Sequence, residues 1–242
     1  MNNDYAASLA STELTQALVK PTAYEYLVHR KRAEFAHLAP QYELQCLLAT
    51  CGRIASMRRR VAQMALSGVE GPVVELCCGT GGVTEELGSL FERVIGIDLS
   101  PDMLARARQR IARAGLQDRV TLREGEASTV GFGDGSLAAV VISLGLHELP
   151  AWIRDLVIAR AARWLKPGGR FVFCDYVLPR NRLVAMVFRW LGRLLIEEEH
   201  FDEYLAYPME QRLQEHGFKL VARQRRCLSC VELSAWSVTE ER

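Results

Sequence analysis

A glycine-rich turn follows an apolar run that contains an acid, in the segment VVELCCGTGGVT at residues 73–84. Gly79 and Gly81 allow the backbone to approach a ligand closely, and they free N–H groups at the start of a following helix. A second acid, Asp98, ends the next apolar run, where its carboxylate can accept hydrogen bonds from both hydroxyls of a ribose. The segment therefore predicts a site for a nucleoside-containing cofactor.

Two kinds of cofactor compete for this loop. A nicotinamide or flavin dinucleotide needs G-x-G-x-x-G, so that its pyrophosphate can rest on the helix start. In that register Cys77 stands where the first glycine is needed. S-adenosylmethionine has no pyrophosphate, and its sites tend to combine an acid on the first strand with G-x-G. Glu75, Gly79 and Gly81 fit that arrangement, so the loop favours S-adenosylmethionine.

The elements around the loop alternate between strand and helix. Near-continuous apolar runs predict parallel strands that are covered on both faces. The predicted strands are 73–77, 93–98, 119–124, 137–143 and 170–176, and the predicted helices are 83–91, 101–115 and 151–165. Ser100 is the expected cap of the second helix, and Pro167-Gly168-Gly169 is the expected turn after the third. Together with two further strands near the C-terminal end of the chain, this order predicts an α/β fold with a doubly wound, mostly parallel, seven-stranded Rossmann-like sheet.

The two ends of the chain differ from this pattern. Residues 219–226 and 227–236 are predicted as final strands, and their connection is too short for a crossover helix, so they should pair antiparallel. Residues 1–70 predict a helical cap and residues 71–242 the cofactor-binding domain, within which 177–217 form a helical insertion over the substrate. Helical spacing predicts two apolar stripes in the cap, which are Leu44, Leu47, Leu48 and Cys51, and Ile54, Met57, Val61, Met64 and Ala65.

Composition excludes several classes of protein. The 242 residues carry a net charge of +1, which gives no reason to expect a nucleic-acid partner. The first residues lack the pattern of a signal peptide, and no apolar run approaches the roughly 20 residues of a spanning helix. The seven cysteines are scattered, which predicts reduced thiols and a cytoplasmic protein. Cys227 and Cys230 have metal-like spacing but no second pair, so no metal site is predicted.

Residues 73–176 resemble the class I S-adenosylmethionine-dependent methyltransferases. The matching segments are VVELCCGTGG, VIGIDLSPDMLARAR, REGEA, DGSLAAVVISLGLHEL and WLKPGGRFVFCDY, in the order of that family. The resemblance implies the cofactor S-adenosyl-L-methionine. The implied contacts are Glu75, Gly79 and Gly81 at the methionine end, Asp98 at the ribose, Leu99 on the adenine, Glu126 and Ala127 at the adenine edge, and Ser143 and Leu144 at the methyl side. Cys77, Thr80 and Met103 complete the expected cofactor contacts, and Tyr42 is expected to close over the cofactor.

Residues 35–64 are similar to the N-terminal stretch of the ubiquinone and menaquinone biosynthesis C-methyltransferases, which methylate prenylated quinol precursors. Tyr42-Glu43, Gly52 and Arg58-Arg59 carry this similarity, and Gly145-Leu146 resembles the same group. The pair His147-Glu148 departs from the usual Arg-Asn of that group. The resemblance implies a small or lipid-like acceptor such as a quinone precursor. An N-, O- or S-methyltransferase of another metabolite, a non-methylating binder and a nicotinamide-dependent oxidoreductase are the alternatives.

Methyl transfer needs an aligned nucleophile and, for many acceptors, a base that removes a proton. His147 is the first predicted base, because it follows the strand 137–143 and an unperturbed imidazole titrates near neutral pH. Glu148 is predicted either to orient His147 or to act directly. Asp175 and Tyr176 end the strand 170–176 and should face the same crevice. Neither Cys77 nor its neighbour Cys78 is predicted to act as a nucleophile.

The segment LVAMVFRWLGRLLI, residues 183–196, predicts an amphipathic helix. Leu183, Met186, Val187, Trp190, Leu194 and Leu195 share one stripe, and Arg182, Arg189 and Arg193 lie elsewhere. The helix could contact the inner face of a membrane, line a passage for a prenyl tail, or pack on the sheet or on a second subunit of a homodimer. The sequence leaves these alternatives open.

Overall fold

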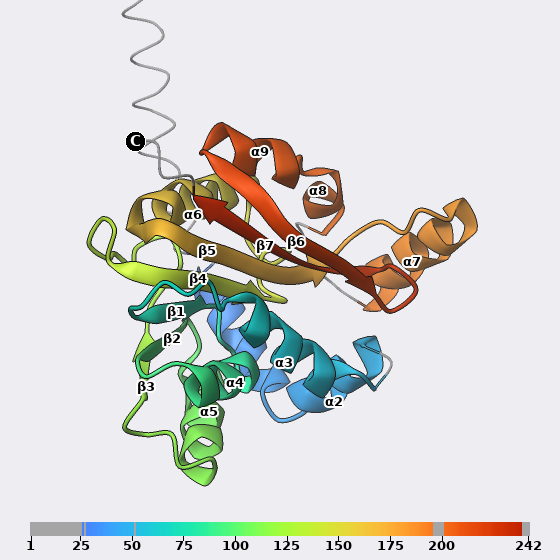
Figure 1. Cartoon of the computed structure of the whole chain (residues 1–242). Helices are drawn as coiled ribbons and strands as arrows, with labels where there is room; N and C mark the ends of the chain where they lie inside the picture. Colours follow the sequence, from blue (N-terminus) through green and yellow to red (C-terminus); the bar gives the residue numbers. More distant parts are fainter. Residues whose placement is uncertain (1–25, 27, 51, 196–200, 239–242) are drawn as a thin grey trace, which may run out of the picture.

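A seven-stranded sheet forms the centre of the protein. The computed structural model describes residues 26, 28–50, 52–195 and 201–238. The strand order is β3-β2-β1-β4-β5-β7-β6 (Figure 1). The strands are β1 (Val73–Leu76), β2 (Val94–Asp98), β3 (Val120–Glu124), β4 (Leu137–Ser143), β5 (Leu165–Tyr176), β6 (Phe218–Arg226) and β7 (Val231–Val238). Strands β1 to β5 are parallel, and β7 pairs antiparallel with both β5 and β6, so the predicted fold class is confirmed.

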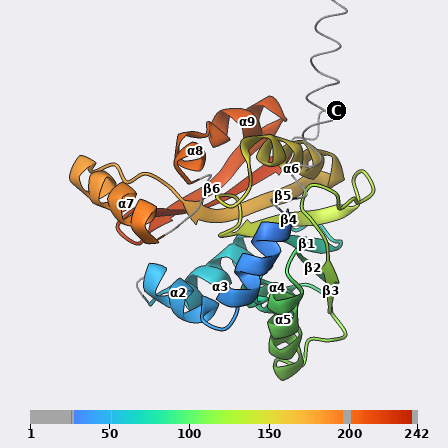
Figure 2. The ribbon, with the colours of Figure 1, turned by 180° about the vertical axis from the view of Figure 1, so that it is seen from behind.

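Helices cover both faces of the sheet, as Figures 1 and 2 show from opposite sides. One face carries α3 (Ile54–Met64), α4 (Gly82–Leu90) and α5 (Pro101–Arg113), and the other carries α6 (Ala151–Trp164), α8 (Phe201–Ala206) and α9 (Met209–Glu215). Each face has its own apolar core, because parallel strands with two covered faces bury nearly every side chain. The remaining helices are residues 28–38, α2 (Tyr42–Ala49) and α7 (Arg182–Leu195).

Local signals in the sequence position several of these elements. Ser100 caps α5, since its Oγ accepts a hydrogen bond from the backbone N–H of Met103 at 3.3 Å. Pro101 occupies the first helical position, where its missing N–H costs nothing. Gly115 follows the helix with a φ of +68°, a left-handed conformation that glycine adopts without strain. The end of β2 and the start of α5 are thereby fixed close to Asp98.

Two predicted boundaries are wrong. Strand β5 already begins at Leu165, which pairs with Leu137 of β4, so Pro167-Gly168-Gly169 is an irregularity within the strand and not a turn before it. Strand β7 begins at Val231, and residues 227–230 form the turn of the β6–β7 hairpin. Cys227, Leu228 and Ser229 have φ values of 51°, 56° and 69°, which no strand can contain.

Ion pairs hold α2 and α3 onto the glycine-rich loop. The guanidinium of Arg58 on α3 donates to both carboxylate oxygens of Glu43 on α2, at 2.8 and 3.0 Å. The hydroxyl of Thr80 donates to Glu43 at 2.5 Å, and Arg110 of α5 lies 2.9 Å from the same carboxylate. Although partial burial opposes the effect, hydrogen bonds from Arg58 and Thr80 lower the pKa of Glu43 to about 2. Glu43 therefore links the N-terminal helices to the loop.

Replacement of Glu43 by Gln should lower the free energy of unfolding by about 1 kcal/mol at pH 7, because Arg58 and Arg110 lose their charged partner. The pKa of Glu43 is lower in the folded state than its ordinary 4.5, so its stabilising contribution is present above pH 4.5 and is lost as the pH falls towards 2. Urea denaturation of wild type and Glu43→Gln across this range should show their difference shrink on acidification.

A matched control is Glu86→Gln. Glu86 lies 3.7 Å from Arg59, whose side chain is 69% exposed, so this pair should contribute less than about 0.5 kcal/mol. Equal losses of stability in the two variants would contradict the role assigned to Glu43.

Candidate active site

A cavity lies at the carboxyl ends of β1, β2 and β4. The order of the sheet reverses between β1 and β4, and this is where open α/β sheets bind their ligands. The cavity has a volume of about 100 Å³. Its lining residues are Lys31, Phe35, Tyr42, Cys77, Gly79, Asp98, Leu99, Met103, Gly125, Glu126, Ala127, Leu144, Gly145, Glu148 and Leu149.

The carboxylate of Asp98 is the best placed group for a ribose. Its Oδ2 accepts the backbone N–H of Gly79 at 2.7 Å, and its Oδ1 accepts that of Ser100 at 2.9 Å. Each oxygen has a further lone pair for a hydroxyl of a ligand. Burial raises the pKa of Asp98, and the backbone hydrogen bonds oppose that rise. Because Asp98 lines the cavity beside the apolar Leu99, Met103 and Ala127, the residues present fit a nucleoside.

The start of α4 is not available to a pyrophosphate. A Cβ placed on Gly82 would lie 2.3 Å from the Arg58 guanidinium, so Arg58 covers the first residue of this helix. Its charge is matched by Glu43, which also reaches Thr80 in the loop. The side chains of Arg58 and Glu43 therefore already occupy the space at this end of the helix. The geometry thus argues against a dinucleotide and agrees with the preference of the loop for S-adenosylmethionine.

The backbone is left-handed at two strand ends that border the cavity. Cys77 after β1 has a φ of 56°, and Leu144 after β4 has a φ of 52°. A Cβ on Gly145 would lie 2.7 Å from the Cβ of Cys77, so the two strand ends meet in close contact. Non-glycine residues in this region store strain, which is typical of functional sites. Burial raises the pKa of the thiols of Cys77 and Cys78, so both stay protonated and unreactive near neutral pH.

Glu75 lies beside the cavity and does not line it. Its side chain is buried and accepts a hydrogen bond from the hydroxyl of Thr84 on α4. Burial raises the pKa of Glu75 to about 8, so most of this carboxyl is protonated at neutral pH. The implied contact with the methionine end stays a prediction. A cationic amino group next to Glu75 would favour its charged form.

The catalytic candidates form a row of polar contacts. Asp175 accepts the Nδ1–H of His147 at 2.7 Å, and it also accepts backbone N–H groups of Leu146, His147 and Tyr176. The Nε2 of His147 lies 3.6 Å from Glu148, and Glu148 lies 2.7 Å from the Nζ of Lys31. Asp175 thus orients His147, and Glu148 is the member of the row that lines the cavity together with Lys31.

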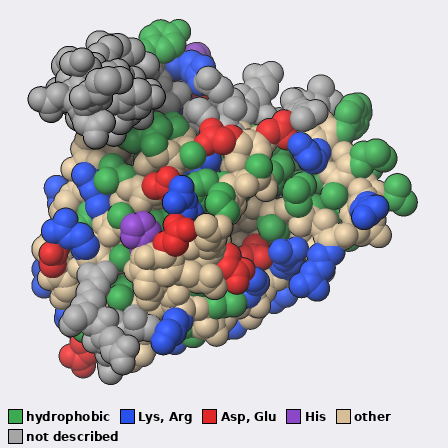
Figure 3. Space-filling view, turned by 90° about the horizontal axis from the view of Figure 1, so that it is seen from above, with side chains coloured by type: hydrophobic (Ala, Val, Ile, Leu, Met, Phe, Trp, Pro, Cys, Tyr) green, Lys and Arg blue, Asp and Glu red, His purple; other side chains and the backbone are tan. Residues whose placement is uncertain are grey.

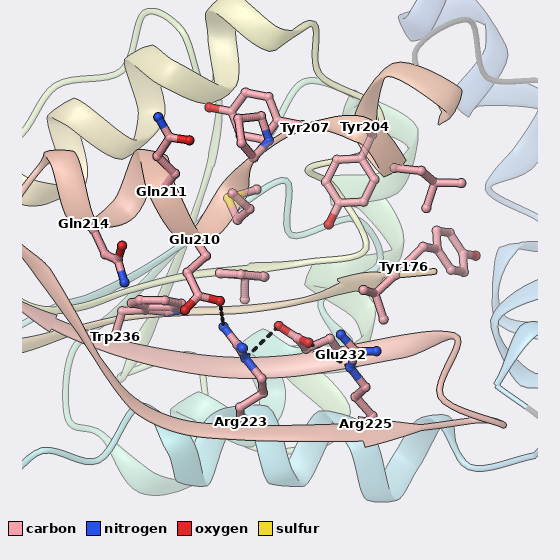
Figure 4. A pocket seen from close by; sticks show the side chains of 15 residues that line it. Tyr176, Tyr204, Tyr207, Glu210, Gln211, Gln214, Arg223, Arg225, Glu232 and Trp236 are labelled. Carbon is pink, nitrogen blue, oxygen red and sulfur yellow. Dashed lines mark hydrogen bonds and ion pairs between the residues drawn. The ribbon is translucent and has the colours of Figure 1, made fainter. Parts of the chain in front are cut away.

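A second cavity of about 540 Å³ lies beyond Tyr176, between β5–β7 and the helices α8 and α9. The ring of Tyr176, which lines this cavity, packs against His147 with centroids 4.8 Å apart, and the next residue, Glu148, lines the first cavity. The charged groups of the second cavity pair with one another, since Arg223 contacts both Glu210 and Glu232 (Figure 4). Aromatic rings, including those of Tyr204 and Tyr207, form the opposite wall (Figure 4). Because the charged side chains are paired with one another and the opposite wall is aromatic, this cavity suits an uncharged part of a ligand.

The structure brings together some of the predicted site residues and separates others. Those on the first cavity are Tyr42, Cys77, Gly79, Asp98, Leu99, Met103, Glu126, Ala127, Leu144 and Glu148. Those off it are Glu75, Thr80, Gly81, Ser143, His147, Asp175 and Tyr176. Sequence reasoning did not assign Lys31 or Phe35 to the site; no motif marks Lys31, whereas Phe35 begins the segment 35–64 that carries the second resemblance. Within the described residues, no group of three His, Cys, Asp or Glu side chains could hold a metal ion.

The helix of residues 28–38 and α2 narrow the first cavity. Its 100 Å³ is below the roughly 300–1,000 Å³ of most small-molecule sites. Lys31, Phe35 and Tyr42 of these helices form one wall, with the ring of Tyr42 3.7 Å from the position of a Cβ on Gly79. A ligand of nucleoside size needs more space than this, and we expect the wall to move outward when one binds. The Lys31–Glu148 ion pair is one contact that this movement would break.

Comparisons with known proteins agree with this geometry. The family described as a methyltransferase domain matches residues 73–169. A demethylmenaquinone methyltransferase of Lactiplantibacillus plantarum is 31% identical over 84% of this chain and 93% of that protein. The ubiquinone/menaquinone biosynthesis C-methyltransferase UbiE of Geobacter sulfurreducens is 27% identical over 74% and 71%. Magnesium protoporphyrin IX methyltransferase of Synechocystis, solved with bound SAH, shares the fold, with a TM-score of 0.59 and 15% identity over 76% of this chain and 83% of that chain.

The two glycines of the loop should differ in their tolerance of a side chain. Both have positive φ, but a Cβ on Gly81 would lie 2.9 Å from the Cβ of Ala107, whereas one on Gly79 meets only Tyr42 at 3.7 Å. Gly81→Ala should therefore lower the free energy of unfolding by about 2–4 kcal/mol and Gly79→Ala by about 1 kcal/mol. Equal losses in urea denaturation would show that contact with Ala107 does not constrain the loop.

Glu75 should make stability depend on pH. Its pKa is about 8 in the folded protein and 4.5 ordinarily, so its stabilising contribution is full below pH 4.5 and is lost as the pH rises to 8. Relative to Glu75→Gln, wild type should lose up to about 4 kcal/mol over this interval. Asp98 titrates in both proteins, so the comparison isolates Glu75. Parallel stability curves from urea denaturation at several pH values would contradict the buried, protonated state of Glu75.

Proposed function

The chain belongs to the class I S-adenosylmethionine-dependent methyltransferases, and we propose that its acceptor is a prenylated quinol that is methylated on a ring carbon. The similarity to the demethylmenaquinone methyltransferase carries this proposal. It covers 84% of the chain, so it extends well beyond the methyltransferase domain at residues 73–169.

The residues of the first cavity divide between cofactor and acceptor. When bound, S-adenosylmethionine supplies a methyl carbon that its sulfonium makes electrophilic. Asp98 would hold the ribose hydroxyls, and Leu99, Met103 and Ala127 would contact the adenine. The ring of Tyr42, above Gly79, offers an aromatic face to a cation. Glu148 and Leu144 are left for the acceptor.

Glu148 is assigned as the group that takes the proton of the acceptor hydroxyl. Its carboxylate lines the cavity, whereas His147 lies behind it and is held by Asp175. A quinol hydroxyl that gives up its proton directs electron density to the neighbouring ring carbon, which makes that carbon a better nucleophile. As the new carbon–carbon bond forms, the bond from the methyl carbon to sulfur would break, with the electron pair staying on sulfur. The methylated ring carbon then loses its hydrogen as a proton, which restores the aromatic ring and the hydroxyl. His147 then acts as the positioning residue for Glu148. We place this reaction in the cytoplasm, where the free thiols of the described cysteines stay reduced.

The experiment is an assay of the purified protein with S-adenosylmethionine and a reduced, prenylated demethylquinol, with the product identified by mass spectrometry. A product that is heavier by one methylene group and carries the new methyl on carbon is expected. Glu148→Gln should lower kcat by about 100-fold or more, since a general base contributes that much to proton transfer. Calorimetric titration should show that this variant still binds S-adenosylmethionine.

Lys31→Met is the matched control. It breaks the same ion pair but keeps the carboxylate, so kcat should stay within a few-fold of wild type. Loss of turnover in Lys31→Met and Glu148→Gln alike would make the pair structural. Methylation of nitrogen, oxygen or sulfur in a water-soluble metabolite would contradict the proposed acceptor. Binding of S-adenosylmethionine without transfer to any acceptor would contradict the proposed reaction.

A further inference from the structure

Helix α7 presents an apolar face to solvent. Leu183, Met186, Val187 and Trp190 are between 50% and 70% exposed. On the opposite side of the helix, Phe188 packs against Tyr176 and Phe201, with ring centroids 6.0 and 5.9 Å apart. The helix is thus anchored by one aromatic side chain while its larger apolar surface stays uncovered. Exposed surface of this kind marks interaction sites.

Two other segments add to this surface. Leu44, Leu47 and Leu48 of α2 are 58%, 43% and 70% exposed, so the predicted stripe of α2 does not face the core. Leu228, in the turn of the β6–β7 hairpin, is 80% exposed. These side chains come from parts of the chain that are far apart in sequence.

The hairpin turn joins the three segments. The Sγ of Cys227 lies 3.2 Å from the carbonyl of Thr50, at the end of α2. The backbone N–H of Val177, in the stretch that leads to α7, donates to the carbonyl of Cys230 at 2.9 Å. Both ribbon views place α2, the turn and α7 on the same flank (Figures 1 and 2). We call this surface of α2, residues 227–230 and α7 the docking edge.

The backbone of the turn is strained, and it places the side chain of Leu228 in solvent. Cys227, Leu228 and Ser229 are consecutive non-glycine residues with left-handed φ. Glycine or asparagine would adopt this conformation more easily than leucine. A strained, nearly fully exposed leucine has no role in the stability of the isolated fold, and it indicates that the side chain meets a partner.

The charges beside the docking edge identify the kind of partner. Arg53, Arg180, Arg182 and Arg226 are exposed and adjoin its segments, while Arg189 pairs with Asp202 at 3.3 Å. Figure 3 shows hydrophobic side chains with Lys and Arg side chains among them on the flank of α7. The acidic residues 197–199 lie outside the described residues. Apolar side chains mixed with arginine suit the interface of an anionic bilayer. A symmetric dimer through the same patch would bring its arginines together.

We propose that the docking edge binds the protein to the surface of an anionic phospholipid bilayer. No helix in the described part of the chain is long and apolar enough to cross a membrane, so the contact is interfacial. Leu228 and Trp190 enter the boundary between headgroups and acyl chains, and the arginines contact lipid phosphates. This proposal goes beyond the proposed function and does not depend on the acceptor.

The test is sedimentation of the full-length protein with vesicles of phosphatidylcholine, with or without about one third of phosphatidylglycerol. Wild type should bind the anionic vesicles at least tenfold more tightly, and less tightly at high salt. Leu228→Asn keeps a residue that tolerates left-handed φ, and Trp190→Gln removes an aromatic anchor. The double variant should lose at least tenfold in binding to anionic vesicles. Arg180→Gln with Arg182→Gln should weaken binding to anionic vesicles alone.

Leu90→Gln is the control, because Leu90 is 43% exposed at the end of α4, away from the docking edge. Its vesicle binding should equal that of wild type. Titration with S-adenosylmethionine in the absence of vesicles should give the same affinity for all variants, which shows that they fold and separates this test from the methyl-transfer assay. Absence of binding to anionic vesicles would overturn the proposal. So would light scattering that finds a wild-type dimer and a monomeric double variant.

Discussion

Three carboxyl groups are buried at or near the carboxyl ends of strands β1, β2 and β5, and the surrounding loops and helices supply their hydrogen-bond partners. A buried carboxyl without partners would cost several kcal/mol. Asp98 of β2 takes N–H groups from the glycine loop after β1, and Asp175 of β5 takes those of the loop after β4. Glu75 of β1 is satisfied by Thr84 of α4. Each acid therefore ties one strand to a neighbouring connection.

From this arrangement we expect the cavity to be more rigid on one side than on the other. The side of Asp98 and Gly79 is fixed by hydrogen bonds between strands and loops, and by the close approach of Gly145 to Cys77. The side of Lys31 and Tyr42 belongs to short helices that precede the sheet, and ion pairs at Glu43 and Glu148 hold them in place. Ion pairs that are partly exposed to water break more readily than the buried hydrogen bonds between the strands and their loops.

Much of the central fold could be predicted from the sequence. The strands β1, β2 and β4 are largely apolar and buried, and Ser100 and Pro101 mark the start of α5, so local signals agree with the tertiary structure there. The position of Asp98 and Gly79 on the cavity could be predicted, because an acid and a glycine at two strand ends are a pattern of residue types with fixed spacing. The turn at Cys227 was missed, since three left-handed non-glycine residues contradict the local preferences on which prediction rests.

Other parts of the site could not be predicted, for reasons of geometry. Helical spacing shows that Leu44, Leu47 and Leu48 share a face, but it cannot show whether another element covers that face. Adjacent residues of a loop point in different directions, so the sequence could not decide which of His147 and Glu148 lines the cavity. Lys31 enters the site from a helix that is distant in sequence. Its role depends on how the N-terminal helices lie on the sheet.

The separation of the two walls has a consequence for the evolution of this fold. The half of the cavity around Asp98 depends on backbone hydrogen bonds and on glycines, so few substitutions there are compatible with folding. Lys31, Phe35 and Leu149 line the other half, and none of them is a glycine. Drift at those positions can alter which molecule is accepted while the other half is inherited unchanged. A single ancestral scaffold could thus diversify in specificity without passing through variants that fail to fold.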